Sequence, residues 1–143
     1  MQLSVDHILQ EKPMSCWHAA ARMLYAYRNS ACVHPMPVEW ALDQGIAPDD
    51  FIKLAEAVGL ETLPRVNQSY GWTFLDRALG AYGPLWAAGQ WNGFNHIVVI
   101  TGVDPGGTVF VNDPAFPAPV VRDMGWFNDK IDKNVEIPLM YLP

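Results

Sequence analysis

Two side chains near the start of this sequence are of types that could take part in hydrolysis of an amide by a thiol. Cys16 stands six residues after Gln10, at a point where a helix is expected to begin. A cysteine attacks a carbonyl carbon as its thiolate, and the N–H groups and dipole of a helix N-terminus stabilise that anion. The side-chain amide of Gln10 could join the Cys16 N–H as a donor to the developing oxyanion.

Such a thiolate also needs a base to move the protons, and the second half of the sequence offers one. His96 opens an apolar run over residues 96–103 directly after a polar loop, so its ring could face a cleft while its strand stays anchored. Asp113 or Asn112, at the end of the next apolar run, could return beside His96 and orient its imidazole. Adjacent strand residues point to opposite sides, and the sequence alone does not give the register that decides between them.

Other interpretations of the two cysteines have to be weighed. A cysteine can be a small buried hydrophobe, and Cys16 and Cys32 allow one disulfide although they make no disulfide framework. Cys16 and His18, with Cys32 and His34, could also be imagined as a zinc site. Residues two apart in a helix do not face one another, so Cys16 and His18 cannot easily share a metal. We therefore expect no metal ion.

The elements that must position these side chains are helices in the first part of the chain and strands in the second. Residues 15–28 contain neither Gly nor Pro and have apolar residues at helical spacing, which predicts a helix with Ser15 as its N-cap. Further helices are predicted over residues 48–58 and 72–81. Apolar, β-branched runs predict strands at 84–91, 96–103, 108–113 and 135–142, with a hairpin turn at 104–107. This order is typical of an α+β domain.

Length and composition set limits on the class of protein. A chain of 143 residues, half of them hydrophobic, fits a single domain, residues 1–143, with a core of its own. The formal net charge of −6, without any basic run, argues against nucleic acid and anionic membranes as partners. The apolar runs are far shorter than the roughly 20 residues of a membrane span. The N-terminus also lacks the basic and apolar pattern of a signal peptide.

The motifs around these residues resemble those of the papain-like cysteine proteases. Gln10 and the sequence Ser15-Cys16-Trp17, opening an Ala-rich helix, are similar to the nucleophile region of that family. The strand that begins at His96, and the hairpin that ends in Asn-Asp-Pro, are similar to its histidine and Asn/Asp strands. The resemblance implies an N-terminal helical part packed on a C-terminal antiparallel sheet, with the active cleft between them.

The same resemblance implies roles for the residues. Cys16, His96 and Asp113 would form a catalytic triad with Gln10 as helper, and no cofactor would be needed. Asp113 is preferred to Asn112 because the bacterial branch of the family ends this strand with Asp-Pro. His18 departs from the family, which usually has a small residue at that position. The tryptophans are expected in the core and the cleft wall, and two of them on the strand before His96 could line the substrate groove: Trp86 and Trp91.

Cys16 and His96 are 80 positions apart, and this compactness is similar to bacterial papain-like effector and toxin proteases. The resemblance implies a protein or peptide substrate, delivery into the cytoplasm of a target cell, and a cognate immunity protein. One alternative keeps the triad but makes the chain an amidase, deamidase or transglutaminase. Another makes it a peptide-binding module without catalysis.

Overall fold

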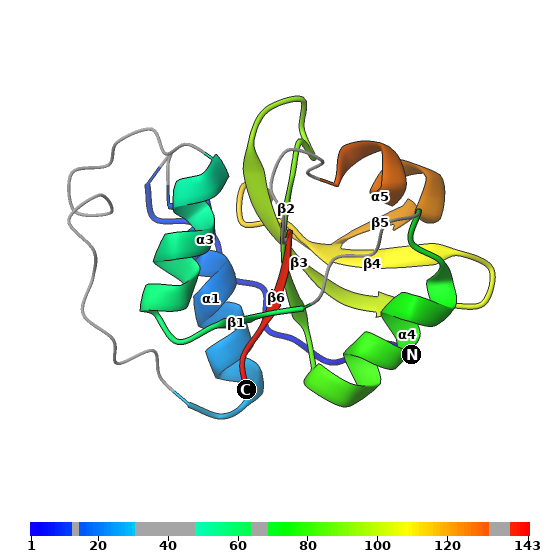
Figure 1. Cartoon of the computed structure of the whole chain (residues 1–143), viewed down its shortest axis with the longest axis horizontal. Helices are drawn as coiled ribbons and strands as arrows, with labels where there is room; N and C mark the ends of the chain where they lie inside the picture. The colour runs from blue at the N-terminus through cyan, green and yellow to red at the C-terminus, as the bar shows by residue number, and fades with distance from the viewer. Residues whose placement is uncertain (13–14, 31–47, 64–68, 132–137) are drawn as a thin grey trace.

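The computed structural model describes residues 1–12, 15–30, 48–63, 69–131 and 138–143, and these contain four helices and six strands. Figure 1 shows them as a twisted sheet with helices on both sides. The helices are α1 (Cys16–Tyr27), α3 (Pro48–Ala57), α4 (Trp72–Tyr82) and α5 (Met124–Lys130). The strands are β1 (Glu61–Thr62), β2 (Leu85–Gly89), β3 (His96–Val103), β4 (Thr108–Asn112), β5 (Val120–Asp123) and β6 (Leu139–Tyr141).

The sheet has the order β1-β6-β2-β3-β4-β5, and each neighbouring pair is antiparallel. The β2–β3 register sets Gly89 opposite His96, and the β3–β4 register sets Val99 opposite Asn112. A bulge in β3 follows Ile100 and precedes Gly102. The first residue of β3 and the last residue of β4 therefore lie toward the same end of the sheet.

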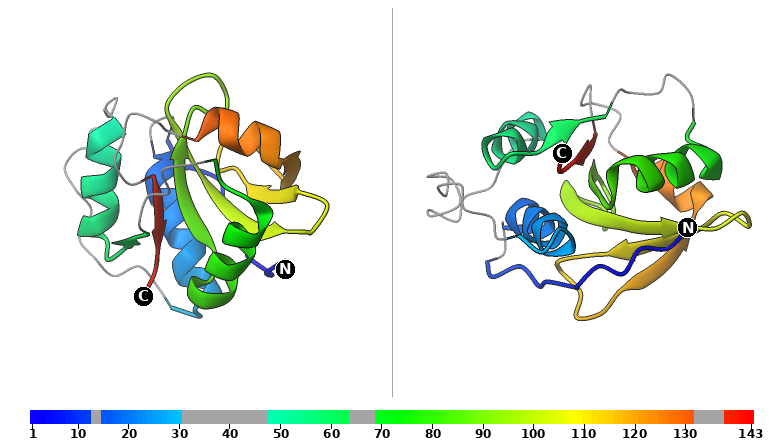
Figure 2. Two further views of the ribbon diagram at one scale, coloured as in Figure 1. Left: turned by 45° about the vertical axis from the view of Figure 1, so that its right-hand side comes forward. Right: turned by 90° about the horizontal axis from the view of Figure 1, so that it is seen from below.

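Helices cover both faces of this sheet, with α1 and α3 on one side and α4 and α5 on the other (Figures 1 and 2). Alternation along β3 directs Ile97 and Val99 into the cluster with α1 and α3, while Val98 and Ile100 join the cluster with α4. Every residue of β3 is buried. Burial on both faces explains why β3 is a continuous apolar run without the alternation of a half-exposed strand.

The start of α1 is fixed by a tryptophan from the sheet. Trp17 and Trp86 are both fully buried, and the Trp86 indole N–H donates to the Trp17 carbonyl at 3.1 Å. Ser15 stands at the N-cap position, but its hydroxyl bonds back to the N–H and the carbonyl of Lys12. The predicted N-cap position of Ser15 is therefore confirmed, but its side chain makes no capping hydrogen bond, because the hydroxyl closes the preceding turn instead.

The N-terminal residues lie along the sheet as an extended segment, which Figure 2 shows in dark blue. The Leu3 N–H donates to the Thr101 carbonyl, and the Val103 N–H donates to the Met1 carbonyl, each at 2.8 Å. The segment thus pairs with residues 101–103 of β3. These residues have no partner in β2, whose first residue, Leu85, is opposite Ile100. Its pairing was not predicted, because an isolated extended segment has no periodic pattern.

The predicted helices at 15–28, 48–58 and 72–81 are confirmed by α1, α3 and α4, and the predicted α+β class is confirmed. The strand predicted at 96–103 is confirmed with the same bounds as β3, and those predicted at 84–91 and 108–113 are confirmed with shorter bounds as β2 and β4. Part of the strand predicted at 135–142 lies outside the described residues, and its described part contains β6. None of the described helices has the length and apolar character needed to cross a membrane.

The sequence pattern predicts neither β5 nor α5. β5 is a short edge strand whose side chains are only partly buried, so it lacks a strong apolar run. Only seven residues long, α5 is too short for helical periodicity to show. Its start has a local signal, since the Asp123 carboxylate accepts from the Trp126 N–H at 2.7 Å as a side-chain N-cap.

Gly89 gives a test of the packing at the end of β2. A Cβ there would lie 2.6 Å from the Trp91 ring and 2.7 Å from the Lys130 carbonyl oxygen. We expect Gly89→Ala to lower the free energy of unfolding by about 1–3 kcal/mol, because backbone or indole must move. Gly80→Ala, inside α4 with only a methionine end 3.4 Å away, should be neutral or stabilising. Urea unfolding measures the stability of both variants. A Gly89→Ala variant as stable as wild type would contradict this packing.

Candidate active site

Three of the predicted site residues meet at one end of the sheet. Cys16 is the first residue of α1, His96 is the first residue of β3, and Asp113 directly follows β4. His96 Nε2 donates to Asp113 Oδ1 at 2.6 Å, and the Cys16 thiol lies within hydrogen-bonding reach of the same ring. Cys16 and His96 are 3 % exposed and Asp113 is 2 % exposed. The structure therefore brings the thiol, the imidazole and the carboxylate together in a buried cluster.

Of the two neighbours at the end of β4, Asp113 is the one that faces the histidine. Asn112 is opposite Val99, and its side-chain amide donates to the Val5 carbonyl at 3.2 Å. Alternation turns the next residue to the other face, where the Asp113 carboxylate reaches His96. Asn112 holds the N-terminal segment instead.

The Asp113 carboxylate receives two further donors. The Ala115 N–H donates to Oδ1 at 2.9 Å, and the Asn92 side-chain amide donates to Oδ2 at 3.0 Å. Burial raises the pKa of Asp113, but the bonds with His96, Ala115 and Asn92 and the charge of His96 hold it below its ordinary value. Asp113 therefore stays ionised. Asn92 was missed because nothing in its local sequence links it to a strand 20 residues further on.

The imidazole of His96 lies between two groups that can carry negative charge. Burial lowers the pKa of His96, whereas the hydrogen bonds and charges of Asp113 and Cys16 raise it from 6.5 to about 9. The ring is therefore protonated at neutral pH. Because Nε2 bonds Asp113, Nδ1 is the ring nitrogen left for the Cys16 sulfur. A cationic imidazole beside a thiol at a helix start favours the thiolate.

His18, the departure noted in the sequence, behaves differently. Burial and the positive charge of Arg22 lower the pKa of His18 to about 4, against an opposing effect of Glu11. The ring is neutral at physiological pH and meets the Trp17 ring edge-on, with 5.3 Å between the ring centroids. His18 thus adds no positive charge near Cys16 at that pH.

The alternative roles of the cysteines can be compared with the same coordinates. Cys16 is a free thiol. Among the residues that the structure describes, no group of three or more His, Cys, Asp and Glu side chains could hold a metal ion. Cys32 and His34, the other half of the imagined zinc site, lie outside the described residues.

Gln10 belongs to the loop that leads into α1 and contacts the far end of β4 through its backbone. Its N–H donates to the Pro114 carbonyl at 2.9 Å, next to Asp113. Its side-chain amide donates to the Lys12 carbonyl at 3.0 Å, and that carbonyl also accepts from the Ser15 hydroxyl. The loop before the helix and the strand that ends at the carboxylate are thus tied together.

The expected lining of a groove by Trp86 and Trp91 is wrong, because both are buried. Trp86 packs between the sheet and α1, and Trp91 packs on Trp126 of α5, with 4.8 Å between the ring centroids. An exposed aromatic ring at this end is that of Phe94, which is 56 % exposed and lies with its centroid 5.6 Å from that of His96. An aromatic residue in the polar loop just before His96 was the signal available in the sequence.

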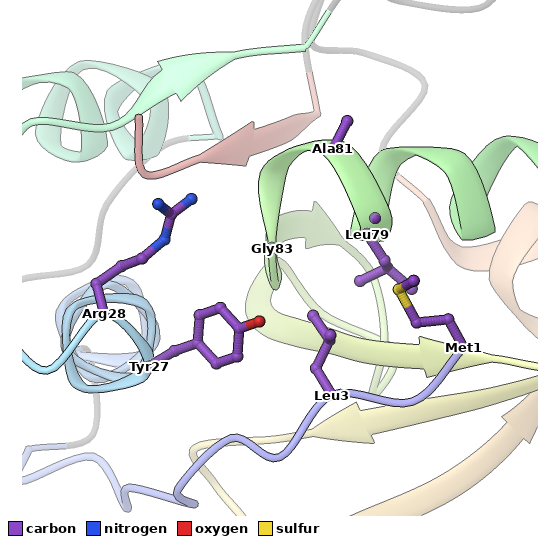
Figure 3. A pocket seen from close by; sticks show the side chains of 8 residues that line it. Met1, Leu3, Tyr27, Arg28, Leu79, Ala81 and Gly83 are labelled. Carbon is purple, nitrogen blue, oxygen red and sulfur yellow. The ribbon is translucent and has the colours of Figure 1, made fainter.

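A pocket of about 430 Å³ lies away from this cluster, at the other end of α1 (Figure 3). Figure 3 shows the Tyr27 ring reaching from the end of that helix toward Leu3, whereas Arg28 extends away from Met1 and Leu3. The Arg28 guanidinium donates to the Tyr82 and Leu142 carbonyls, each at 3.1 Å. The rest of its lining comes from α4 and Gly83. None of the candidate catalytic residues contributes to this pocket.

A thiol at a helix start that faces a histidine and carboxylate on an antiparallel sheet defines the papain-like class of cysteine protease. The family model described as "Papain-like cysteine protease AvrRpt2" matches residues 1–132, so the chain belongs to this family. The resemblance inferred from the motifs is confirmed, and the protein is a papain-like cysteine protease.

Comparison of structures agrees on the fold. The chain is similar to a solved double glycine motif protease from an AMS/PCAT transporter, which was crystallised in complex with the leader peptide. The two share 24 % sequence identity and a TM-score of 0.58, over 99 % of this chain and 94 % of the other. No curated protein matches the sequence.

The pairing of His96 with Asp113 predicts how thiol reactivity depends on pH. Asp113→Ala should lower the raised pKa of His96, so the ring would lose its proton at a lower pH. A neutral ring would stabilise the Cys16 thiolate less. We expect the pH profile of alkylation by iodoacetamide to move to higher pH in this variant. Asn112→Ala is the matched control and should keep the wild-type profile. A shift in Asn112→Ala and none in Asp113→Ala would reverse the assignment.

Proposed function

We propose that the chain is a cysteine endopeptidase that cleaves protein or peptide substrates with Cys16, His96 and Asp113 as its catalytic triad. The observation that carries this proposal is the position of the His96 ring, which contacts the Cys16 thiol and donates to the Asp113 carboxylate. In this arrangement the carboxylate orients the imidazole and stabilises its protonated form, and the imidazole transfers protons for the nucleophile.

The reaction begins with attack of the Cys16 sulfur on the carbonyl carbon of the scissile peptide bond. The C–S bond forms, and the carbonyl electrons move to the oxygen. The His96 imidazolium then gives its proton to the leaving nitrogen, and the C–N bond breaks as the thioester forms. Neutral His96 next takes a proton from water, whose oxygen attacks the thioester and releases the acid. Thiolate and imidazolium are restored.

The oxyanion of both tetrahedral intermediates needs donors, and we assign them to the Cys16 N–H and the Gln10 side-chain amide. The Ser15 hydroxyl bonds back to Lys12, so it makes no side-chain cap to the first turn of α1 and does not compete for the Cys16 N–H. The Gln10 amide is held at the Lys12 carbonyl, and Lys12 is bonded in turn to the residue that precedes Cys16. These bonds, which tie Gln10 to the residue before Cys16, support the assignment.

Comparisons support a peptide substrate and suggest the biological setting. The structurally similar protease was crystallised with a peptide bound, and AvrRpt2 is the name of a bacterial effector family. We infer a bacterial effector or interbacterial toxin that acts in the cytoplasm of a target cell. A cognate immunity protein would protect the producing cell in the second case.

Cys16→Ala tests the nucleophile. The variant should lose all cleavage, and its melting temperature should stay close to that of wild type, because removal of one sulfur at a helix start leaves only a small cavity. Both proteins are incubated with a bacterial or host lysate, and new protein N-termini are identified by mass spectrometry. N-termini that appear with wild type and not with Cys16→Ala identify the substrates.

The same experiment separates the rival functions. Deamidated or cross-linked glutamines without new N-termini would indicate an amidase, deamidase or transglutaminase. Equal sets of N-termini from the two proteins would exclude Cys16 as the nucleophile.

Gln10→Ala tests the oxyanion donor. We expect kcat to fall by roughly 10²- to 10³-fold with a smaller change in KM, because the donor acts on charge that develops in the transition state. Gln90→Ala is the matched control, since Gln90 is an exposed glutamine whose amide bonds Asn95 in the β2–β3 loop. A rise in KM at constant kcat would instead make Gln10 a substrate-binding residue.

A further inference from the structure

We propose that Asn92 is a positioning residue of this protease, whose side-chain amide fixes the plane of the Asp113 carboxylate so that the carboxylate orients His96. The inference rests on the proposed triad and adds a member that neither the motifs nor the family match assigns. Asn92 would contact neither substrate nor the reacting atoms, and would act only through Asp113.

The two oxygens of Asp113 have different surroundings. Oδ1 accepts from His96 Nε2 and from the Ala115 N–H, both within 2.9 Å, whereas Oδ2 accepts from Asn92 Nδ2 at 3.0 Å. Among the described residues, Asn92 is the only hydrogen-bond donor to Oδ2. Rotation about the Cβ–Cγ bond moves both oxygens away from their donors, so a donor on Oδ2 adds a second, separate restraint on the plane of the carboxylate. Without it, a buried charged oxygen would also lack a protein donor.

The turn that carries Asn92 is fixed from the backbone. The Gln90 carbonyl accepts from the Gly93 N–H at 3.0 Å, which closes a four-residue turn with Asn92 at its third position. Gly93 has a φ of 86°, a left-handed conformation that favours glycine. The Gln90 N–H donates to the Lys130 carbonyl at 2.8 Å. These bonds do not involve the Asn92 side chain, which is therefore available for Asp113.

The side chain next to Asn92 anchors the same turn in the core. The Trp91 indole N–H donates to the Ala87 carbonyl at 3.1 Å. Its ring packs on Trp126 and Phe127 of α5, with centroid distances of 4.8 and 5.6 Å. The short helix α5 thus supports the turn, and the turn presents the Asn92 amide to Asp113. This chain of contacts gives Asn92 the fixed geometry that a positioning role needs.

Asn92→Ala should lower kcat by about 10-fold with little change in KM, and should move the iodoacetamide profile to higher pH, as in Asp113→Ala but less far. The double variant Asn92→Ala/Asp113→Ala should match Asp113→Ala alone, because Asn92 acts through that carboxylate. Asn95→Ala, in the same loop and bonded to Gln90 rather than to Asp113, is the matched control and should behave as wild type.

Asn92→Asp gives a second test that preserves the size of the side chain. A protonated carboxyl can donate to Asp113, whereas an ionised one repels it, so activity relative to wild type should fall as the pH rises. This pH signature would not arise from a purely structural role. Melting curves of all variants show whether the turn remains folded, and Asn92→Asp decides the question if Asn92→Ala does not fold.

Three outcomes would overturn the inference. A lower kcat without a shifted alkylation profile would make Asn92 merely structural. If the double variant lost activity by the product of the two single losses, Asn92 would act independently of Asp113. Wild-type behaviour of Asn92→Ala, while Cys16→Ala and Asp113→Ala are impaired, would remove Asn92 and leave the triad intact. Full activity of Cys16→Ala would instead remove the proposed triad itself.

Discussion

The structure depends on keeping a positive charge on a buried imidazole. Burial alone would discharge His96, so an ionised carboxylate on one side and a thiol that can ionise on the other must hold its proton. This requirement explains why three separate segments converge at one end of the sheet: the start of α1, the start of β3 and the end of β4. Each contributes one group, and no two of the groups are neighbours in sequence.

The sheet holds these groups in place because its middle is packed with apolar side chains, while the end that carries His96 and Asp113 is polar. β3 is buried along its whole length, with apolar side chains packed on both faces. Its first residue, His96, therefore starts from a fixed position, and so does Asp113 after the paired strand β4. Trp86 adds a bond from the sheet to the carbonyl of Trp17 in the first turn of α1. The helix that carries the thiol is thus held against the strand beside His96.

The sequence was sufficient to predict the long elements and the residues at their ends. Helical spacing located α1, and apolar runs located β3 and β4, so Cys16 and His96 stood out as reactive groups at element boundaries. The choice of Asp113 over Asn112 could not come from spacing, because a register shift of one residue exchanges the faces of a strand. Asn92 could not be predicted, since its position depends on a turn supported by the short helix α5. Burial of Trp91 was missed for the same reason.

The extended N-terminal segment has a consequence for biosynthesis. Val5 is bonded to Asn112, and His7 donates to the Phe116 carbonyl, so these contacts join residues 107 and 109 positions apart. A ribosome must therefore release Asn112 and Phe116 before these first residues find their partners. Contacts of such long range slow folding, because loop closure costs entropy before any contact rewards it. The nascent chain consequently carries its cysteine without the histidine and the carboxylate until His96 and Asp113 have left the ribosome, so the proposed catalytic centre cannot assemble before that point.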